Sequence, residues 1–254
     1  MPVPSPAFDR AAALATASSK AAGDPPAIPA ATVVPVRLGP AGTLEVLMLR
    51  RNSSLTFAGG MWVFPGGRLD DADHAGADDL ETAARRAATR EAGEEAGLAL
   101  DPDELVWFAH WTPPQVTIKR FATFFFVAHA PVDDAGVTID GGEIHEHGWF
   151  APRDALARRN ALEIELSPPT WITLEQLARA DEATPDGDVA AVVAHLAGDG
   201  PEFFETRIVM AGDAAVALYV GDAGYEPNDA EVPGGRHRLW MAPEGWRYER
   251  DDWD

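Results

Sequence analysis

The chain has 254 residues, enough for one sizeable domain with an appendage or for two small domains. Acidic residues outnumber basic residues 41 to 20, and the formal net charge of -21 disfavours nucleic acid and anionic membranes as partners. The lack of cysteine excludes disulfides, thiolate zinc sites and cysteine nucleophiles, and no apolar run reaches the roughly 18 residues of a membrane span.

The first 30 residues are rich in Ala, Pro and Ser and contain no uninterrupted apolar stretch followed by a clear cleavage site. We expect a flexible N-terminal arm over residues 1–30 and a cytoplasmic location. Strands are expected next at residues 31–38, 44–51 and 62–64, because β-branched and large apolar residues alternate with Gly-rich turns there.

A helix is expected from about Asp79 to Gly97, after an acidic loop over residues 70–79. Asp78 and Glu81 have the spacing of an N-terminal cap, and a glycine is a common helix end. A row of small apolar residues spaced by four would let this helix lie close to a sheet: Leu80, Ala84, Ala88, Ala92 and Ala96.

Three carboxylates and one guanidinium stand together near the end of this helix, at Arg90, Glu91, Glu94 and Glu95. At about 100° per residue the three carboxylates fall within an arc of about 100° on one face. Three anions aimed at one spot call for a cation, and Mg²⁺ prefers such oxygen ligands. The alternative is an ordinary solvated face, since charged residues are mostly exposed.

The run from Arg90 to Leu98 resembles the second half of the signature of the Nudix hydrolases at every fixed position, and Phe64-Pro65-Gly66-Gly67 resembles its entry. The resemblance implies a Nudix-type diphosphatase (pyrophosphohydrolase) that cleaves diphosphate linkages with Mg²⁺ or Mn²⁺. It also implies an α+β fold, an α/β/α sandwich with a mixed sheet between helices.

The chain departs from the signature between its two halves. The family has 13 residues between the first glycine and the arginine, whereas this chain has 22 residues between Gly67 and Arg90. Counting back from Arg90 places the first Glu of the signature at Thr82, with Glu81 beside it. Which residue supplies the carboxylate of this first Glu is therefore left open.

The remaining pattern predicts strands at residues 105–111, 120–130 and 144–150 and a helix from about residue 151. The resemblance thus assigns residues 31–160 to a Nudix hydrolase domain. Residues 161–254 are expected to form an extension of helices and short strands packed on the core. Two roles stay open for it, covering the core or making a homodimer contact.

Family roles carry over to matching residues. The resemblance implies that Glu91, Glu94, Glu95 and Gly67 hold the metal and that Arg90 orients the cluster. An additional carboxylate that binds metal or acts as a base is expected at Glu143, with Glu146 as the second candidate. A catalytic role is also open for His145 and His147, against ordinary surface positions.

Substrate contacts are expected from Arg51, Arg68 and Arg120, with Lys119 as an alternative to Arg120. Arg51 and Gly60 partly match an element of Nudix enzymes that cleave coenzyme A, although Thr56 stands where a second Arg is expected. We therefore expect a small diphosphate substrate, with CoA or acyl-CoA first. ADP-ribose, NADH or another nucleoside diphosphate derivative is the alternative, and a Nudix-fold module that binds without cleaving is another.

Two tryptophans near the predicted site have an open role. Trp107 and Trp111 lie in a predicted strand, where either ring is a candidate to stack on a substrate base or to fill the core.

Overall fold

The structure is a computed structural model that describes residues 27–54, 58–114, 120–130, 136–139, 141–184 and 188–251. Most of the expected N-terminal arm, together with Thr56 and Lys119, lies outside these residues.

A mixed sheet forms the centre of the described part, with strand order β3-β2-β1-β6-β5-β8. In addition, β4 pairs with β1, and β7 pairs with β2. The central strand β1 is parallel to β6 and antiparallel to β2. The strands are β1 (Ile28–Leu38), β2 (Leu44–Arg51), β3 (Trp62–Val63), β4 (Gly66–Arg68), β5 (Val106–Thr112), β6 (Phe121–His129), β7 (Ile144–Phe150) and β8 (Glu202–Glu205).

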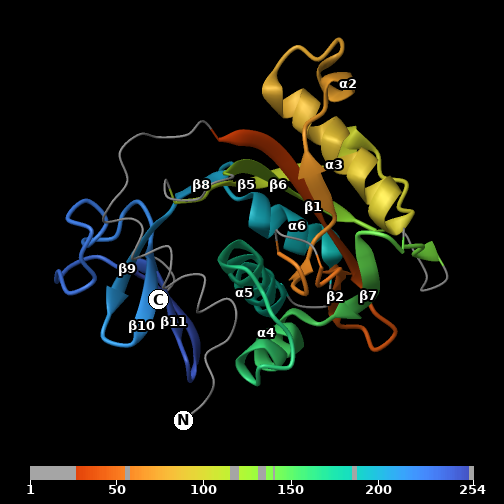
Figure 1. Ribbon diagram of the computed structural model, residues 1–254. Coiled ribbons are helices and arrows are strands. Elements are labelled where there is room, and N and C mark those ends of the chain that lie inside the picture. Colours follow the sequence, from red (N-terminus) through yellow and green to blue (C-terminus); the bar gives the residue numbers. More distant parts are fainter. Residues whose placement is uncertain are drawn as a thin grey trace.

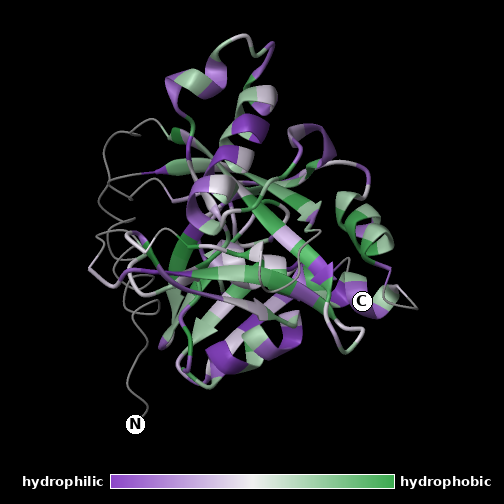
Figure 2. Ribbon diagram, turned by 90° about the vertical axis from the view of Figure 1, so that its right-hand side faces the viewer, coloured by the Kyte–Doolittle hydropathy of each residue, from purple (hydrophilic) through white to green (hydrophobic). Residues whose placement is uncertain are grey.

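Helices cover both faces of this sheet (Figure 1). One face carries α3 (Leu80–Ala96), and the other carries α4 (Pro152–Asn160), α5 (Pro168–Ala183) and α6 (Val189–Ala197). Strand β1 is buried continuously from residue 30 to residue 37, as expected for a strand with both faces covered. In Figure 2 the central strands are mostly hydrophobic, whereas the helices show hydrophilic stripes. The predicted α+β fold, with a mixed sheet between helices, is confirmed.

Helix α3 is close to the sequence prediction, but its first turn differs. The cap is Asp79, whose side chain accepts a hydrogen bond from the backbone N–H of Thr82, rather than the predicted pair of Asp78 and Glu81. Gly97 ends the helix in the left-handed region, at φ 68°. The predicted alanine row is fully buried against the sheet, whereas Leu80 is 44% exposed.

The segment between the two halves of the signature is not a plain loop. It contains the short strand β4 and the short helix α2 (Asp71–His74), neither of which was predicted. Asp70 and Asp73 cap α2 reciprocally through a capping box. A three-residue 3₁₀ helix, η1 (Pro102–Glu104), follows α3. These elements are short enough that hydrophobic periodicity cannot signal them.

The C-terminal region adds both a strand to the main sheet and a second sheet. Strand β8 pairs in parallel with β5, which extends the main sheet by one strand. The second sheet has antiparallel order β12-β11-β10-β9, with β9 (Arg207–Ala211), β10 (Ala214–Leu218), β11 (His237–Ala242) and β12 (Gly245–Arg250). Among the helices described, none has the length and apolar character needed to cross a membrane.

Candidate functional site

Two glutamates of α3 lie directly against the backbone of β4. Glu95 Oε2 accepts a hydrogen bond from the Gly66 backbone N–H at 3.0 Å. A Cβ atom added to Gly67 would stand 2.3 Å from Glu91 Oε1, and one added to Gly66 would stand 2.5 Å from the Ala31 carbonyl. A side chain at Gly66 would therefore push β4 away from β1, whereas one at Gly67 would displace the Glu91 carboxylate.

Arg90 connects this helix face to the segment that precedes it. Its guanidinium contacts Glu91 at 2.8 Å and Glu94 at 3.2 Å through Nη1, and Asp73 at 3.0 Å through Nη2. Nη2 also donates to the backbone carbonyl of Arg68 at 3.2 Å. The hydrogen bond to Asp73 is the main cause that raises the pKa of Arg90 above its usual value. Arg90 therefore links Glu91 and Glu94 on α3 to Asp73 on α2.

Burial raises the pKa of two carboxylates in the cluster. Burial raises the pKa of Glu95 to about 7, and the charge of Glu91 adds to this, while the Gly66 N–H opposes it. Burial also raises the pKa of Glu91, although Arg90 offsets part of the shift. These two carboxylates bear excess negative charge in a partly buried place, which is an environment that a divalent cation would stabilise.

Glu143 lies on the other side of Glu95, and Arg51 connects the two. Arg51 Nη2 contacts Glu143 Oε2 at 3.0 Å, and Arg51 Nη1 lies 3.8 Å from Glu95 Oε1. The backbone of Glu143 is held by Asn52, whose N–H donates to its carbonyl at 2.7 Å. Glu146, the second candidate, instead pairs with Arg50 on the exposed side of the strands at 3.1 Å. The structure thus places Glu143, rather than Glu146, next to the cluster.

Asp73 is the carboxylate that sequence counting missed. The structure places neither Thr82 nor Glu81 in the cluster, because Thr82 bonds to the Asp79 cap and Glu81 pairs with Arg85 at 2.6 Å. Asp73 is 4% exposed and meets Arg90. Burial opposes its charge, but the hydrogen bonds from Arg90 and from the Asp70 backbone outweigh burial and lower the pKa of Asp73.

A different way of counting would have found this residue. Five residues follow Gly67 before Asp73, which is the family spacing from the first glycine to the first Glu. The nine additional residues therefore lie after Asp73 and not before it.

The carboxylate side chains do not form a complete metal site as they stand. In the part of the chain that the structure describes, no three His, Asp or Glu side chains converge closely enough to hold an ion as they stand. Arg90 Nη1 attracts both Glu91 and Glu94, which accounts for part of this spacing. The side chains nevertheless suit Mg²⁺ or Mn²⁺, which prefer oxygen ligands, since Glu91 and Glu95 are two nearby carboxylates whose pKa values burial raises.

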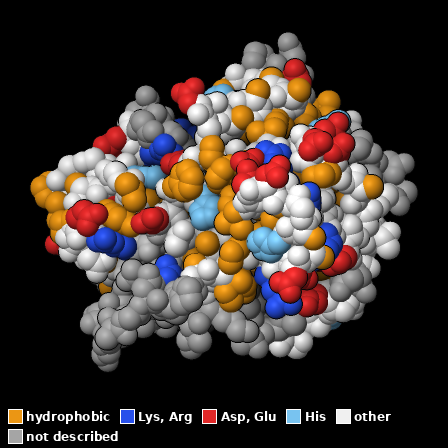
Figure 3. Space-filling view, turned by 90° about the horizontal axis from the view of Figure 1, so that it is seen from above, with side chains coloured by type: hydrophobic (Ala, Val, Ile, Leu, Met, Phe, Trp, Pro, Cys, Tyr) orange, Lys and Arg blue, Asp and Glu red, His pale blue; other side chains and the backbone are white. Residues whose placement is uncertain are grey.

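The predicted substrate residues differ in position. The Arg68 side chain is 71% exposed beside the cluster and contacts Asp70 at 3.1 Å. Arg120, at the start of β6, is 7% exposed and donates to the Pro113 carbonyl at 3.3 Å. His145 is exposed on β7, and His147 is half-buried on the same strand. Acidic and basic side chains stand side by side at several places on the face seen in Figure 3.

The two candidate tryptophans lie in different surroundings. Trp111 is 3% exposed and stacks on Phe204 at 3.8 Å between ring centroids, so it belongs to the core. Trp107 on β5 is half-buried, and its ring centroid lies 4.9 Å from that of Phe124.

Comparisons with known proteins find relatives among the nudix hydrolases. A curated Caenorhabditis elegans protein, whose name assigns it to the nudix hydrolases, is 23% identical over 171 residues. The aligned region covers 55% of this chain and 58% of that protein, so the chain spans less than two thirds of its relative. The crystal structure of a NUDIX hydrolase from Alicyclobacillus acidocaldarius is 25% identical, with a TM-score of 0.55, and covers 65% of this chain and 96% of that one.

The match to the family itself is longer than half of the chain. Residues 27–170, from the start of β1 into α5, match the NUDIX domain. This stretch contains the glycine entry on β4, the acidic face of α3 and the Asp73–Arg90 pair. The chain therefore belongs to the NUDIX domain family.

Proposed function

We propose that this protein is a metal-dependent hydrolase that cleaves a diphosphate linkage by attack of water on phosphorus. The observation that carries the proposal is the burial of Glu91 and Glu95 against the glycine backbone of β4. Burying two neighbouring carboxylates is unfavourable without a cation. Their retention in this place supports a role of the cluster in binding a cation.

Glu91, Glu94 and Glu95, together with the Gly67 carbonyl, would hold Mg²⁺ or Mn²⁺. When bound, such an ion neutralises phosphate charge and lowers the pKa of a bound water. Arg90 keeps Glu91 and Glu94 on one side of the helix through its contacts at 2.8 and 3.2 Å. Asp73 holds Arg90 from the opposite side.

Glu143 is our candidate for the group that accepts a proton from the attacking water. Its side chain is 60% exposed and therefore open to solvent, while Arg51 holds it toward Glu95. A base must come within hydrogen-bond distance of the water that it activates. Arg51, Arg68 and Arg120 are proposed to contact substrate phosphates, which a chain with a net charge of -21 needs in order to attract an anion.

CoA or acyl-CoA is our first substrate class. The support is the partial sequence element that ends at Gly60, whose backbone N–H donates to the Arg51 carbonyl at 3.0 Å. This contact closes a turn with Gly60 in the left-handed region, at φ 79°, next to a predicted substrate residue. ADP-ribose, NADH and other nucleoside diphosphate derivatives are the alternative substrates.

The test is a product analysis by mass spectrometry. The full chain is incubated with Mg²⁺ or Mn²⁺ and a panel of CoA, acyl-CoA, ADP-ribose, NADH and dinucleoside polyphosphates. Adenosine 3',5'-bisphosphate with phosphopantetheine would identify CoA as a substrate. Cleavage of another panel member alone would keep the reaction class and reject CoA.

A matched pair of variants separates catalysis from folding. Glu95→Gln is expected to lower turnover by at least about a hundredfold, since it removes a charged group from a preorganised site. Glu81→Gln lies on the same helix but pairs with Arg85, away from the cluster, and should leave turnover unchanged. Binding of a panel member without any product would instead favour a non-catalytic module.

A further inference from the structure

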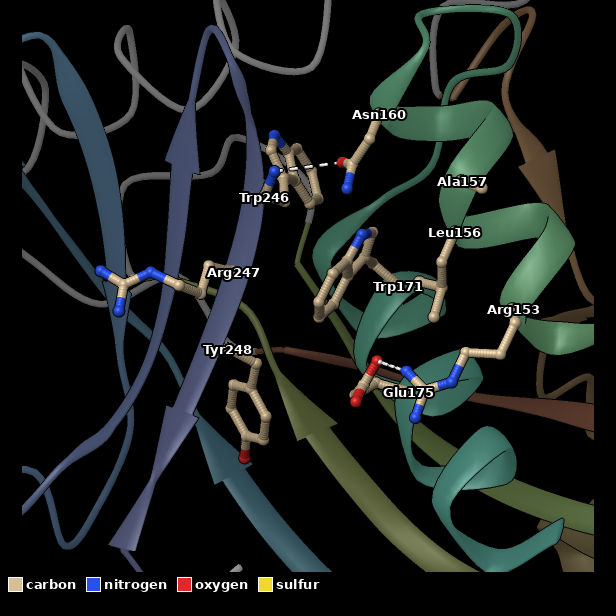
Figure 4. A pocket seen from close by; sticks show the side chains of 9 residues that line it. All are labelled: Arg153, Leu156, Ala157, Asn160, Trp171, Glu175, Trp246, Arg247 and Tyr248. Atoms are coloured by element: carbon tan, nitrogen blue, oxygen red, sulfur yellow. Dashed lines mark hydrogen bonds and ion pairs between the residues drawn. The ribbon is translucent and has the colours of Figure 1, made fainter. Parts of the chain in front are cut away.

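A groove of about 270 Å³ lies between helices α4 and α5 and strand β12. Figure 4 shows the nine residues that line it, namely Arg153, Leu156, Ala157, Asn160, Trp171, Glu175, Trp246, Arg247 and Tyr248. The groove is on the opposite side of the main sheet from α3. Leu156, Trp171 and Trp246 belong to the core on that side, whereas the α3 alanines belong to the other core. It is therefore separate from the acidic cluster.

The walls of the groove combine aromatic rings with polar and charged side chains. The rings of Trp171 and Trp246 lie 6.5 Å apart between centroids, at an angle of 48°. Trp246 points from β12 toward the helices, whereas Arg247 points away from the groove (Figure 4). Arg247 lies instead over the ring of Trp240, 5.7 Å from its centroid. Alternation along the strand thus gives the groove aromatic rings rather than this cation.

Two indole N–H groups at this groove have no hydrogen-bond acceptor among the described residues. They belong to Trp171, 5% exposed, and Trp246, 4% exposed. Figure 4 shows the indole nitrogen of Trp171 at the end of its ring that faces Asn160 and Trp246. A buried donor without an acceptor costs about 1–3 kcal/mol. An acceptor supplied by a ligand would recover this free energy.

The surrounding contacts hold these rings in place. Asn160 Oδ1 accepts a hydrogen bond from the Trp246 backbone N–H at 3.1 Å. The Arg159 guanidinium lies over the Trp246 ring, 3.9 Å from its centroid. A site whose walls are already positioned loses little conformational entropy when a ligand binds.

Charge and size narrow the ligand class. Arg153 contacts Glu175 at 2.7 Å and Glu182 at 2.8 Å, so the charged groups at the rim are already paired with each other. The groove is also smaller than the roughly 300–1,000 Å³ of sites for drug-sized ligands. A neutral, flat ligand of one or two rings suits it better than a whole dinucleotide.

We propose that this groove binds a small neutral aromatic heterocycle that has a ring nitrogen or carbonyl acceptor, as a free purine base does. The ring would lie against the indole faces, where aromatic pairs gain about 0.5–1.5 kcal/mol beyond area burial. The acceptor would take the hydrogen bond from Trp171 Nε1. This site is independent of the proposed hydrolase activity.

The test uses the full chain and two probes, adenine and hypoxanthine, at up to millimolar concentration. Indole N–H signals in ¹H–¹⁵N spectra report on each tryptophan directly. Saturable shifts are expected at Trp171 and Trp246 and not at Trp240, whose Nε1 already donates to Glu249 at 3.0 Å. Absence of saturable shifts at Trp171 and Trp246 with both probes would overturn the proposal.

Substitutions in and near the groove test whether the probe binds there. Trp171→Phe retains a ring without the donor and should weaken probe binding about five- to tenfold, whereas Trp240→Phe should not change it. Ala157→Trp adds bulk from the exposed side of α4 and should block binding even if Trp171→Phe fails to fold. Probe binding that survives in Ala157→Trp, or that is lost in the active-site variant Glu95→Gln, would place the ligand elsewhere and contradict the proposal.

Discussion

Asp73 Oδ2 accepts a hydrogen bond from Arg90 Nη2 at 3.0 Å across 17 residues of sequence. The pair closes the segment between the two halves of the family signature, although that segment is nine residues longer than the family spacing. Arg86 stabilises the added residues through a hydrogen bond to the Ala75 carbonyl at 2.7 Å. The additional residues therefore follow Asp73 in the chain and do not prevent its contact with Arg90.

The Asp73–Arg90 pair gives the first prediction. Asp73→Asn should lower turnover about 10- to 100-fold, because Arg90 then loses a charge-assisted contact and orients Glu91 less well. Asp71→Asn, two residues away on the exposed side of α2, should have little effect. Steady-state kinetics with any cleaved diphosphate would measure this. Equal activities for the two variants would show that Asp73 has no positioning role.

Gly67 gives the second prediction. Gly67→Ala should abolish metal binding and activity, since its Cβ would stand 2.3 Å from Glu91 Oε1 and displace that carboxylate. Gly93→Ala is the control, on the helix that carries Glu91, where an added Cβ would lie 3.7 Å from the Leu98 carbonyl oxygen, an ordinary contact. This control should stabilise the protein by about 0.5–1 kcal/mol, because alanine is the better helix former. Calorimetric titration with Mn²⁺ and thermal unfolding give both quantities.

The sequence predicted the long elements well because burial on one or two faces leaves a periodic pattern. Strand β7 was predicted at its observed bounds, and α3 within one residue at each end. It predicted β4 and α2 poorly, since elements of three and four residues have no period to detect. For the candidate site, spacing within one helix predicted that Arg90 stands beside glutamates, and Arg90 does contact Glu91 and Glu94.

Contacts between distant segments were beyond sequence reasoning. The pairing of Arg51 with Glu143 depends on the registration of β2 against β7, where a bulge shifts the register at Arg50 and Arg51. Counting back to Thr82 left the first Glu of the signature open for a related reason. Counting backwards assumed that α3 alone supplied the missing carboxylate, whereas the tertiary fold brings in α2.

The buried pair of Asp222 and Arg238 in the C-terminal sheet gives the third prediction. Arg238 Nη2 contacts Asp222 Oδ1 at 2.6 Å, with both side chains almost fully buried. Arg238→Leu should destabilise the protein by about 3–5 kcal/mol, since it leaves a buried carboxylate without its cation. Replacing both residues, Asp222→Leu with Arg238→Leu, should cost less than Arg238→Leu alone. Urea unfolding of the three proteins tests this, and an equal cost for both variants would contradict it.

The same pair predicts an acid sensitivity. Burial opposes the charge of Asp222, but the hydrogen bond from Arg238 and those from the His237 and Gly224 backbones outweigh burial and lower its pKa below 3.8. A carboxyl with a lowered folded pKa contributes stability above its unfolded pKa, and this contribution is lost as pH falls through the folded value. The difference in unfolding free energy between wild type and the double leucine variant should therefore shrink below about pH 4. A difference independent of pH down to pH 2 would exclude this contribution.

Glu95 predicts the opposite dependence on pH. Its folded pKa of about 7 lies above the ordinary value of 4.5, so the folded state holds a proton that the unfolded state has lost between these two values. The contribution of Glu95 to the stability of the metal-free protein therefore falls as pH rises from about 4.5 to 7. Glu95→Gln removes this cost, and it should stabilise the metal-free protein at pH 8 by at most about 3 kcal/mol, with little effect at pH 4.

Adding a divalent metal should reverse the stability order of wild type and Glu95→Gln at pH 8. Mg²⁺ or Mn²⁺ binds the ionised carboxylate, so adding metal should raise the melting temperature of wild type more at pH 8 than at pH 5, where Glu95 must first release its proton. Glu95→Gln should gain little from metal at either pH. Thermal unfolding of both proteins with metal and with chelator, at each pH, measures these effects. If chelator-treated Glu95→Gln were no more stable than wild type at pH 8, burial of this carboxylate would carry no cost, and its charge could not be the reason that the site requires a cation.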